Sequence, residues 1–322
     1  MRSKALMAIA WCLLGSLAAL SQGGGATGQA PVAETVAPNI PGVVAGGTKV
    51  QLLQEGLQGA QGATSLPDGT LLFTERNVNR INKVDKDGNI SSYMEDTSAT
   101  NSFSFDPKGR VIGVQYTPAQ VGVLAPVKTT LADQCDGNSF GRPNDLVIDK
   151  KGGVYFTDDL GKPTEGIKPR VCYIKPDGGV IKITDDIARP NGIQLSPDER
   201  ILYVDDTNGD AIRAFDVQPD GSTRNERIFA TITEGLRKTD AGATSSGADG
   251  LAIDGAGRLY VTAYSGVQVF SPQGRYLGSI PIPRQASNLA FAGPDKKTLY
   301  VLSINALYKI PMLTEGYMGR AK

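Results

Sequence analysis

A phrase of alternating polar and apolar residues recurs six times along the chain. Each copy begins with a polar residue and a short apolar alternation, passes through a turn rich in Pro, Asp and Gly, and ends in a second apolar run. The copies begin at Gln61, Asn101, Asn144, Asn191, Asp249 and Asn288. Alternation with a period of two residues between turn signals predicts β-strands, and no segment shows a convincing amphipathic helical pattern.

The spacing of these copies predicts the architecture. Successive copies begin 39 to 58 residues apart, which leaves room for about four strands of five or six residues with their turns. Six four-stranded units in series predict a six-bladed β-propeller. A linear β-solenoid is the alternative, although its repeats are usually shorter.

The last copy lacks one strand. After Asn288 the chain has room for three strands before a C-terminal tail at residues 313–322. We expect the fourth strand to come from residues 49–54, ahead of the first copy, because an N-terminal strand in that place would close the ring and remove its open edges. The sequence therefore predicts an all-β propeller over residues 48–312.

The N-terminal region predicts export. Arg2 and Lys4 precede a mostly apolar run at residues 5–20, and small residues follow, so we expect residues 1–30 to be a signal peptide. The run is short for a membrane span, and an uncleaved anchor is the alternative. Residues 31–47, rich in Gly, Ala and Pro, predict a flexible linker. We expect a periplasmic or secreted protein with no membrane attachment after signal cleavage.

Composition excludes several chemistries. Lys plus Arg and Asp plus Glu are balanced at 33 each, so no basic excess points to nucleic acid. The chain contains no His, which removes Ser-His-Asp catalysis, Cys-His catalysis and all His metal sites. A metal must therefore be held by oxygen ligands or thiolates, and a general base must be Asp, Glu, Lys or Tyr. Cys135 and Cys172 either form a disulfide in an oxidising compartment or remain unpaired thiols.

The polar residues that begin the six copies are candidates for a metal site. Sixfold pseudo-symmetry predicts that their side chains converge at one level on the ring axis, where they offer carbonyl and carboxylate oxygens. Such a set suits Ca²⁺ best, with Mg²⁺, Mn²⁺ or Zn²⁺ as alternatives. Asp249 is the only formal charge among the six. The competing interpretation is that these residues cap strands and hold water, a role open to Asn101 and Asn288 even beside a metal.

Two arginines precede axial asparagines in the same phrase. Arg-Pro-Asn occurs at residues 142–144 and again at residues 189–191. The Pro restricts the backbone of the approach to each axial position. The two arginines could project over the axial site and bind an anionic group of a substrate, or they could form surface ion pairs. We expect the longer loops at residues 158–169 and 233–248 to form the walls of the pocket.

Several of these phrases resemble the senescence marker protein/gluconolactonase family, which includes regucalcin. The matching segments are residues 142–149, 190–198, 248–254, 266–274 and 289–295. Together they extend the resemblance over about residues 49–312. The resemblance implies a six-bladed propeller with one divalent metal on its axis and, in many members, hydrolysis of sugar lactones.

The resemblance also implies the site residues. The metal ligands of the family, a Glu, two Asn and an Asp, correspond here to Gln61, Asn144, Asn191 and Asp249. Where the family has Glu in a Glu-Gly-Pro phrase, this sequence has Gln-Gly-Ala at residues 61–63, which removes one negative charge and lowers the expected Ca²⁺ affinity. Neither Glu55 nor Glu75 occupies the repeat position that would compensate.

These inferences predict a divalent-metal-dependent hydrolase that opens a sugar lactone or a similar cyclic ester. We assign Asp249 to orient or deprotonate the attacking water, and Asn144 and Arg142 to position the substrate. We expect a small-molecule lactone as the partner and a monomeric protein. Two alternatives are a phosphotriesterase-like hydrolase on the same scaffold and a non-enzymatic binding propeller in which Ca²⁺ is structural.

Overall fold

The computed structural model of the protein describes residues 35–162, 165–239, 242–320 and 322. The predicted signal peptide at residues 1–30 lies outside the described residues. The described chain is nearly all β-structure, with one short 3₁₀ turn, η1 (Arg76–Val78). None of its helical segments has the length and apolar character needed to cross a membrane.

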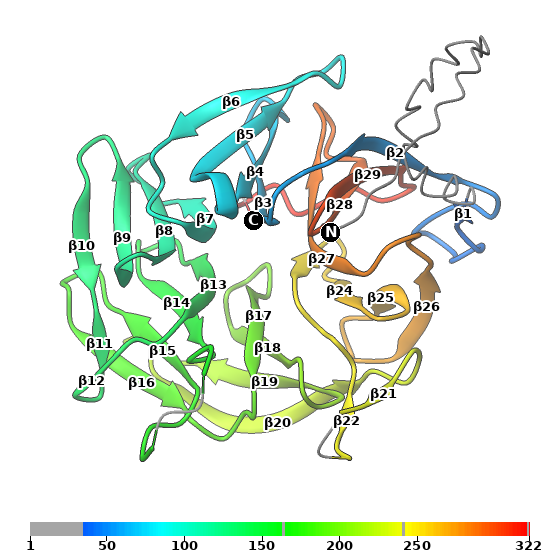
Figure 1. Ribbon diagram of the computed structural model, residues 1–322. Helices are drawn as coiled ribbons and strands as arrows, with labels where there is room; N and C mark the ends of the chain where they lie inside the picture. The colour runs from blue at the N-terminus through cyan, green and yellow to red at the C-terminus, as the bar shows by residue number, and fades with distance from the viewer. Residues whose placement is uncertain (1–34, 163–164, 240–241, 321) are drawn as a thin grey trace, which may run out of the picture. The chain divides into compact units, whose positions relative to one another are not determined.

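Six antiparallel blades follow one another around a ring, which confirms the predicted six-bladed β-propeller (Figure 1). Five blades are built from four strands that are consecutive in sequence. The first two blades contain β3 (Ala60–Ser65), β4 (Leu71–Glu75), β5 (Arg80–Val84), β6 (Ile90–Glu95), β7 (Thr100–Phe105), β8 (Val111–Tyr116), β9 (Ala119–Ala125) and β10 (Thr129–Ala132). The next two contain β13 (Pro143–Ile148), β14 (Val154–Asp158), β15 (Arg170–Ile174), β16 (Val180–Thr184), β17 (Pro190–Leu195), β18 (Ile201–Asp206), β19 (Ala211–Val217) and β20 (Thr223–Thr231). The fifth contains β23 (Leu251–Ile253), β24 (Leu259–Ala263), β25 (Gly266–Phe270) and β26 (Tyr276–Ile280).

The sixth blade joins the two ends of the propeller. Its strands are β27 (Ala286–Ala292), β28 (Thr298–Ser303), β29 (Ala306–Pro311) and β2 (Lys49–Glu55). The N-terminal β2 pairs antiparallel with the C-terminal β29, with Gln51 opposite Lys309. The predicted closing strand is therefore confirmed, and the open edges of the last blade are paired.

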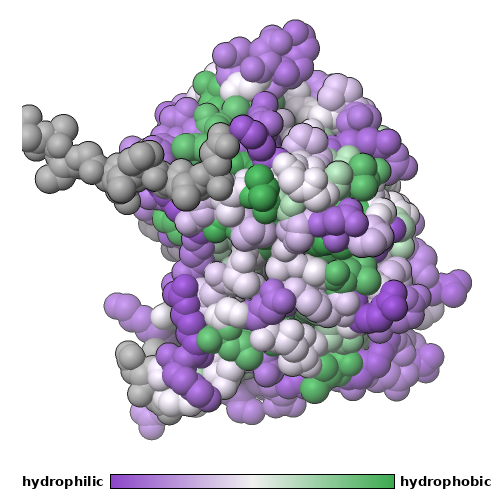
Figure 2. Space-filling view, turned by 90° about the vertical axis from the view of Figure 1, so that its right-hand side faces the viewer, coloured by the Kyte–Doolittle hydropathy of each residue, from purple (hydrophilic) through white to green (hydrophobic). Residues whose placement is uncertain are grey.

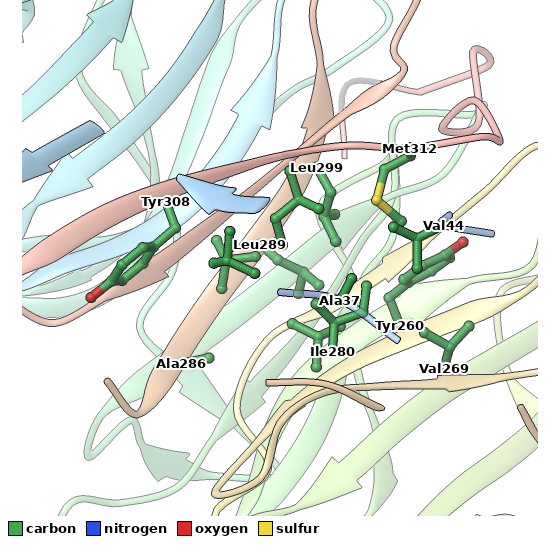
Figure 3. Packing of buried hydrophobic residues seen from close by; sticks show 14 of the residues in the cluster. Ala37, Val44, Tyr260, Val269, Ile280, Ala286, Leu289, Leu299, Tyr308 and Met312 are labelled. Carbon is green, nitrogen blue, oxygen red and sulfur yellow. The ribbon is translucent and has the colours of Figure 1, made fainter. Parts of the chain in front are cut away.

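Residues 35–48 pack against the ring. β1 (Thr35–Val36) pairs with β2, and Ala37, Ile40, Val43 and Val44 are at most 2% exposed. They join a core cluster with side chains of the fifth and sixth blades (Figure 3). The expectation of a flexible linker over residues 31–47 therefore does not hold for residues 35–47, because these apolar side chains bury without the regular period that would reveal them in the sequence.

The hydrophobic core lies between neighbouring blades. The cluster around Phe156, for example, combines residues of the second blade, such as Ile112, with residues of the third. Large second-strand aromatic residues occupy such positions, and Phe73, Tyr155 and Tyr260 are completely buried. On the outer side of the ring, apolar residues occur in small groups among hydrophilic ones (Figure 2).

Two short hairpins are added to the blades. They are β11 (Gln134–Cys135) with β12 (Asn138–Ser139), and β21 (Arg237–Lys238) with β22 (Thr244–Ser245). Cys135 of the first hairpin forms a disulfide with Cys172 of β15. This pairing settles the alternative that the sequence left open and fixes the hairpin to the third blade.

Candidate functional site

The axial polar residues sit at irregularities in the innermost strands. In five of the innermost strands, the pairing register with the second strand shifts close to the polar residue that begins the strand. The shifts lie between Gln61 and Ala63 in β3, Thr100 and Ser102 in β7, Pro143 and Leu146 in β13, Pro190 and Ile193 in β17, and Ala286 and Asn288 in β27. In the fifth blade Asp249 lies just before β23. A bulge takes a residue out of the ladder and redirects its side chain, which here turns polar groups toward the ring axis.

Glycines let the innermost strands approach one another. A Cβ on Gly192 would lie 2.1 Å from the carbonyl oxygen of Asp249, and one on Gly62 would lie 2.5 Å from that of Asn101. Gly62 also has a positive φ of 41°, which favours glycine. Residues next to the axial positions are therefore small because neighbouring blades touch there.

Two buried amide oxygens at the axis lack a hydrogen-bond partner among the described residues. They are Oε1 of Gln61 and Oδ1 of Asn191, and both side chains are nearly inaccessible to solvent. The Gln61 amide donates a hydrogen bond to the carboxylate of Asp249, while the Asn191 Nδ2 donates to Thr207 Oγ1 at 2.9 Å. Buried oxygens without donors are costly unless something positive binds them, so this site fits a hard cation.

Asn144 contributes a further oxygen on the same axis. Its Oδ1 accepts a hydrogen bond from Asn101 Nδ2 at 2.8 Å and keeps a second lone pair. Within the described ranges, no three Asp, Glu, His or Cys side chains form a metal cluster. A cation at this place would therefore be held mainly by amide oxygens, with Asp249 as the charged group.

Asn101 and Asn288 are tied to the backbone and to neighbouring side chains. Asn101 Oδ1 accepts from Arg76 Nη1 at 2.6 Å, and Asn288 Oδ1 accepts from the backbone N–H groups of Leu289 and Ala63. The structure thus gives these two residues the capping role that the sequence left open to them.

Two carboxyl groups at the axis have raised pKa values when no cation is bound. Burial, followed by the charge of Asp145, raises the pKa of Asp249 to about 7, although the Gln61 hydrogen bond and Arg189 act in the opposite direction. Burial and the Asp249 charge raise the pKa of Asp205 well above its usual range. Because a cation would stabilise the ionised forms, the electrostatics of the axis also suit a metal.

A buried carboxylate organises the two predicted arginines. Asp159 is completely buried and accepts hydrogen bonds from Nε and Nη2 of Arg142, from Arg189 Nε at 3.3 Å and from Asn144 Nδ2 at 3.2 Å. Arg142 and Arg189 therefore do form ion pairs, as one of the two alternatives expected, but their partner Asp159 is buried and not at the surface. About a third of each arginine side chain stays exposed, 32% for Arg142 and 37% for Arg189.

The exposed parts of these arginines line a cavity of about 400 Å³. Leu160, Ile167 and Asn208 complete its wall. Asp159 lines this cavity and accepts a hydrogen bond from the axial Asn144, so the cavity adjoins the axial site. The part of the predicted loop 158–169 that the structure describes therefore contributes to the pocket.

Sequence reasoning missed Asp159, Arg76 and the acids that orient the Arg-Pro-Asn phrases. The N–H of Arg142 donates to Asp158 Oδ1 at 2.8 Å, and the N–H of Arg189 donates to Asp206 Oδ1 at 3.0 Å. Asp158 and Asp206 occupy equivalent places at the ends of their second strands. The repeated acid at these two positions could have been found in the sequence, whereas the role of Asp159 depends on how the loop folds.

The two glutamates considered as substitutes for the family Glu are engaged elsewhere. Glu75 accepts hydrogen bonds from Arg80 and Asn82, and Glu55 pairs with Arg284. Neither interaction involves an axial residue, so Gln61 remains the residue at that position of the site.

Comparison with known proteins agrees with this fold. The model of the SMP-30/gluconolactonase/LRE-like region matches residues 60–305. A gluconolactonase of Zymomonas mobilis is 25% identical over 308 residues, which cover 87% of this chain and 85% of that protein. A solved gluconolactonase of Xanthomonas campestris has a TM-score of 0.74 and 25% identity, and the match covers 87% of this chain and 94% of that one.

A more distant structure shares the fold. The calcium-binding protein regucalcin of Agrobacterium tumefaciens has a TM-score of 0.68 at 17% identity, with 84% of this chain and 95% of that one covered. The match to the family model, which spans most of the propeller, carries the assignment. This chain belongs to the SMP-30/gluconolactonase/LRE-like family.

Proposed function

We propose that this protein is a divalent-metal-dependent lactone hydrolase. The observation that carries the proposal is the pair of buried oxygens of Gln61 and Asn191, which have no hydrogen-bond partner in the described part of the chain, together with the Asp249 carboxylate that the Gln61 amide contacts. The gluconolactonase relatives support a lactone as the substrate class. The cavity lined by Arg142, Arg189 and Asp159 offers room for a small molecule, and Asp159 connects it to Asn144 at the axis.

The donor set would hold one cation through Gln61, Asn144, Asn191 and Asp249. When bound, a divalent ion such as Ca²⁺ would polarise the ester carbonyl and favour ionisation of water. One carboxylate with three amides is a low-charge set, so we expect weaker Ca²⁺ binding than a site with two or three carboxylates would give.

The protein's own groups would then carry the proton and hold the substrate. Asp249 would accept a proton from the water whose oxygen attacks the carbonyl carbon, and would return it to the ring oxygen as the C–O bond breaks. The product is an open-chain hydroxy acid. Arg142, fixed through two hydrogen bonds to Asp159, would orient the substrate above the axis, and Arg189 would assist from the neighbouring phrase.

The test combines metal titration with turnover. The protein is stripped with a chelator, and Ca²⁺, Mg²⁺, Mn²⁺ and Zn²⁺ are titrated calorimetrically. Hydrolysis of D-glucono-1,5-lactone, other sugar lactones and a phosphotriester is then followed with and without each metal. One-to-one binding with metal-dependent opening of a lactone supports the proposal. Preference for the phosphotriester would assign the other hydrolase class.

A matched pair of variants separates the site from general effects. We expect Asp249→Ala to abolish both metal binding and turnover, and Asp87→Ala, at an exposed turn, to leave both unchanged. Retained turnover in Asp249→Ala would remove Asp249 from the mechanism.

A non-enzymatic propeller is the second candidate, and Gln61 favours it. Gln61 removes a charge from the family's ligand set and uses its amide on Asp249. This candidate predicts that Ca²⁺ raises the melting temperature while no lactone is turned over.

We also propose that the protein acts outside the cytoplasm. The disulfide between Cys135 and Cys172 supports this, because such bonds persist in oxidising compartments. Fractionation of cells that express the chain with and without residues 1–30 tests it, and retention of both forms in the cytoplasm would contradict it.

A further inference from the structure

The segment that follows β29 crosses the end of the ring opposite the candidate site. Residues 313–320 and Lys322 form this return segment. Its backbone is bound to the ring at several points, with the N–H of Leu313 donating to Val43 O, that of Gly316 to Lys296 O and that of Tyr317 to Ile253 O. The segment is therefore part of the fold, and the end of the described chain lies at the centre of the ring (Figure 1).

Two cationic side chains fix the last turn of the return segment. Arg320 donates to the carbonyl oxygens of Leu195 and Ser196, and its guanidinium lies 5.0 Å from the Tyr317 ring centroid. Lys296, 6% exposed, donates to the carbonyl oxygens of Tyr317 and Arg320 at 3.0 and 2.9 Å. The fourth and sixth blades thus hold the segment from two sides.

Lys322 reaches into the ring from this end. Its Nζ forms an ion pair with Asp145 Oδ1 and donates to Leu146 O at 3.1 Å, and both charged side chains are 2% exposed. Asp145 follows the axial Asn144 directly in β13. Its other oxygen, Oδ2, accepts from the N–H of Ile193 in β17 at 3.3 Å. The ion pair therefore connects two innermost strands that each carry a candidate metal ligand.

The charge of Lys322 matters because the axis is rich in acids. Asp145 lies within electrostatic range of both Asp205 and Asp249. A buried carboxylate without a counter-charge is strongly unfavourable, and like charges nearby increase that cost. The ammonium of Lys322 supplies the opposite charge at the rear of this group.

We propose that the rear of the axis is a cation position that the chain fills with its own Lys322. In this role Lys322 neutralises Asp145 and acts as a positioning residue, because the Asp145 carboxylate spans β13 and β17 next to Asn144 and Asn191. The chemistry that recognises this position is a primary ammonium group at the end of an alkyl chain.

The same side chain separates the axis from solvent on the rear face. A cavity of about 660 Å³ lies beside the return segment and is lined by Lys322, Arg320 and Met318 together with ring residues such as Phe105 and Val147. Lys322 lines this cavity, and its ammonium contacts the buried Asp145. Loss of the side chain would therefore open the acidic axis to small cations from the rear.

Chemical rescue tests this proposal on the metal-free full chain. Lys322→Ala removes the three methylenes and the ammonium that n-propylammonium can replace. We expect the substitution to lower the melting temperature by about 5–10 °C. n-Propylammonium should restore more than half of that loss, while neutral n-propanol should restore little. Equal rescue by both compounds would show a packing role and overturn the cation assignment.

A matched control and a charge cycle complete the test. Lys150 lines the same cavity but is exposed, so Lys150→Ala should leave the melting temperature within about 1 °C of the parent. Equal effects of Lys150→Ala and Lys322→Ala would overturn the proposal.

The charge cycle tests the proposal even if Lys322→Ala folds poorly. Lys322→Met leaves the Asp145 carboxylate without its counter-charge, whereas Lys322→Met combined with Asp145→Asn removes both charges of this pair. The double variant should therefore melt at a higher temperature than Lys322→Met alone. A double variant that is less stable than Lys322→Met would show that the two residues act independently.

Discussion

At the scale of single residues, the charge at position 61 sets how strongly the axis attracts a cation. The Gln61 amide donates to Asp249, and its oxygen has no donor among the residues that the structure describes. Gln61→Glu adds a carboxylate at this point, so we expect Ca²⁺ to bind about 10- to 100-fold more tightly. Titration calorimetry on the metal-stripped protein measures the change.

The control for this substitution adds the same charge away from the axis. Gln51 is exposed on β2, so Gln51→Glu should leave the Ca²⁺ affinity unchanged. If Gln61→Glu also leaves the affinity unchanged, Gln61 does not ligate the ion.

The pKa of Asp249 predicts how stability depends on pH. It is raised to about 7 in the metal-free fold, against about 3.9 in an unfolded chain. The folded state therefore holds a proton more strongly, so the stability cost of ionising Asp249 is absent below about pH 4, grows as the pH rises and is complete above about pH 7. Asp249→Asn should stabilise the metal-free protein by about 1–3 kcal/mol near pH 8 and have no effect near pH 4.

Denaturant unfolding at several pH values measures this change in stability. The control is Asp198, an acid whose pKa is shifted in the opposite direction. The pKa of Asp198 is lowered chiefly by its hydrogen bond from Ser196, so its ionised form stabilises the fold. Asp198→Asn should therefore not stabilise the protein at any pH. A pH-independent effect of Asp249→Asn would show that Asp249 titrates normally.

At the scale of elements, the β11–β12 hairpin is connected to the backbone of Arg142 through two side chains. The Cys135–Cys172 disulfide fixes the hairpin to β15, and Arg170 donates to Ser139 O at 2.6 Å and to Asp158 Oδ2 at 3.0 Å. Asp158 also accepts from the N–H of Arg142. The side chains of Arg170 and Asp158 thus connect the disulfide-bonded hairpin to Arg142, which lines the pocket.

Loss of this disulfide should weaken both the fold and the site. Because it closes a loop of 37 residues, removing it should cost about 3–4 kcal/mol, or roughly 10 °C in melting temperature. We expect Cys135→Ala with Cys172→Ala to show this loss and to raise KM more than it lowers kcat. A reducing agent should lower the melting temperature of the parent but not of the double variant, and an unaffected parent would contradict the prediction.

The innermost and second strands were predictable because they are local patterns. Alternation and turn residues mark each strand, and repetition places Gln61, Asn144, Asn191 and Asp249 at equivalent positions. Contacts made once, between segments far apart in sequence, left no such pattern. Asp159 binds two arginines from different blades, and Lys322 reaches a residue 177 positions away. Neither contact repeats, so repeat analysis could not find it.

At the scale of the whole molecule, two N-terminal segments close the ring. β2 completes the sixth blade, and residues 37–44 then fill the junction between the fifth and sixth blades. The labelled side chains of Ala37 and Val44 lie among those of Tyr260, Ile280 and Met312 (Figure 3). Leu313 of the return segment donates its N–H to Val43 O, so both ends of the propeller meet at this junction.

This junction predicts that a short segment outside the repeats controls global stability. Ile40 is 2% exposed, and its side chain occupies the space that a Cβ on Gly278 would otherwise fill. Ile40→Ala should therefore cost about 2–4 kcal/mol through lost burial and the cavity that remains. Val36 lies four residues earlier and is 48% exposed, so Val36→Ala should cost less than about 0.5 kcal/mol.

Removal of the whole segment tests the second closure directly. A chain that begins at residue 49 keeps all four strands of the sixth blade but loses the buried side chains of residues 37–44. Compared with a chain that begins at residue 35, we expect a melting temperature lower by at least about 10 °C, since several apolar side chains become exposed at once. The loss should affect the entire cooperative transition, because a closed ring cannot open at one junction without exposing the apolar faces of both neighbouring blades. Equal melting temperatures for the two chains would mean that β2 alone closes the propeller.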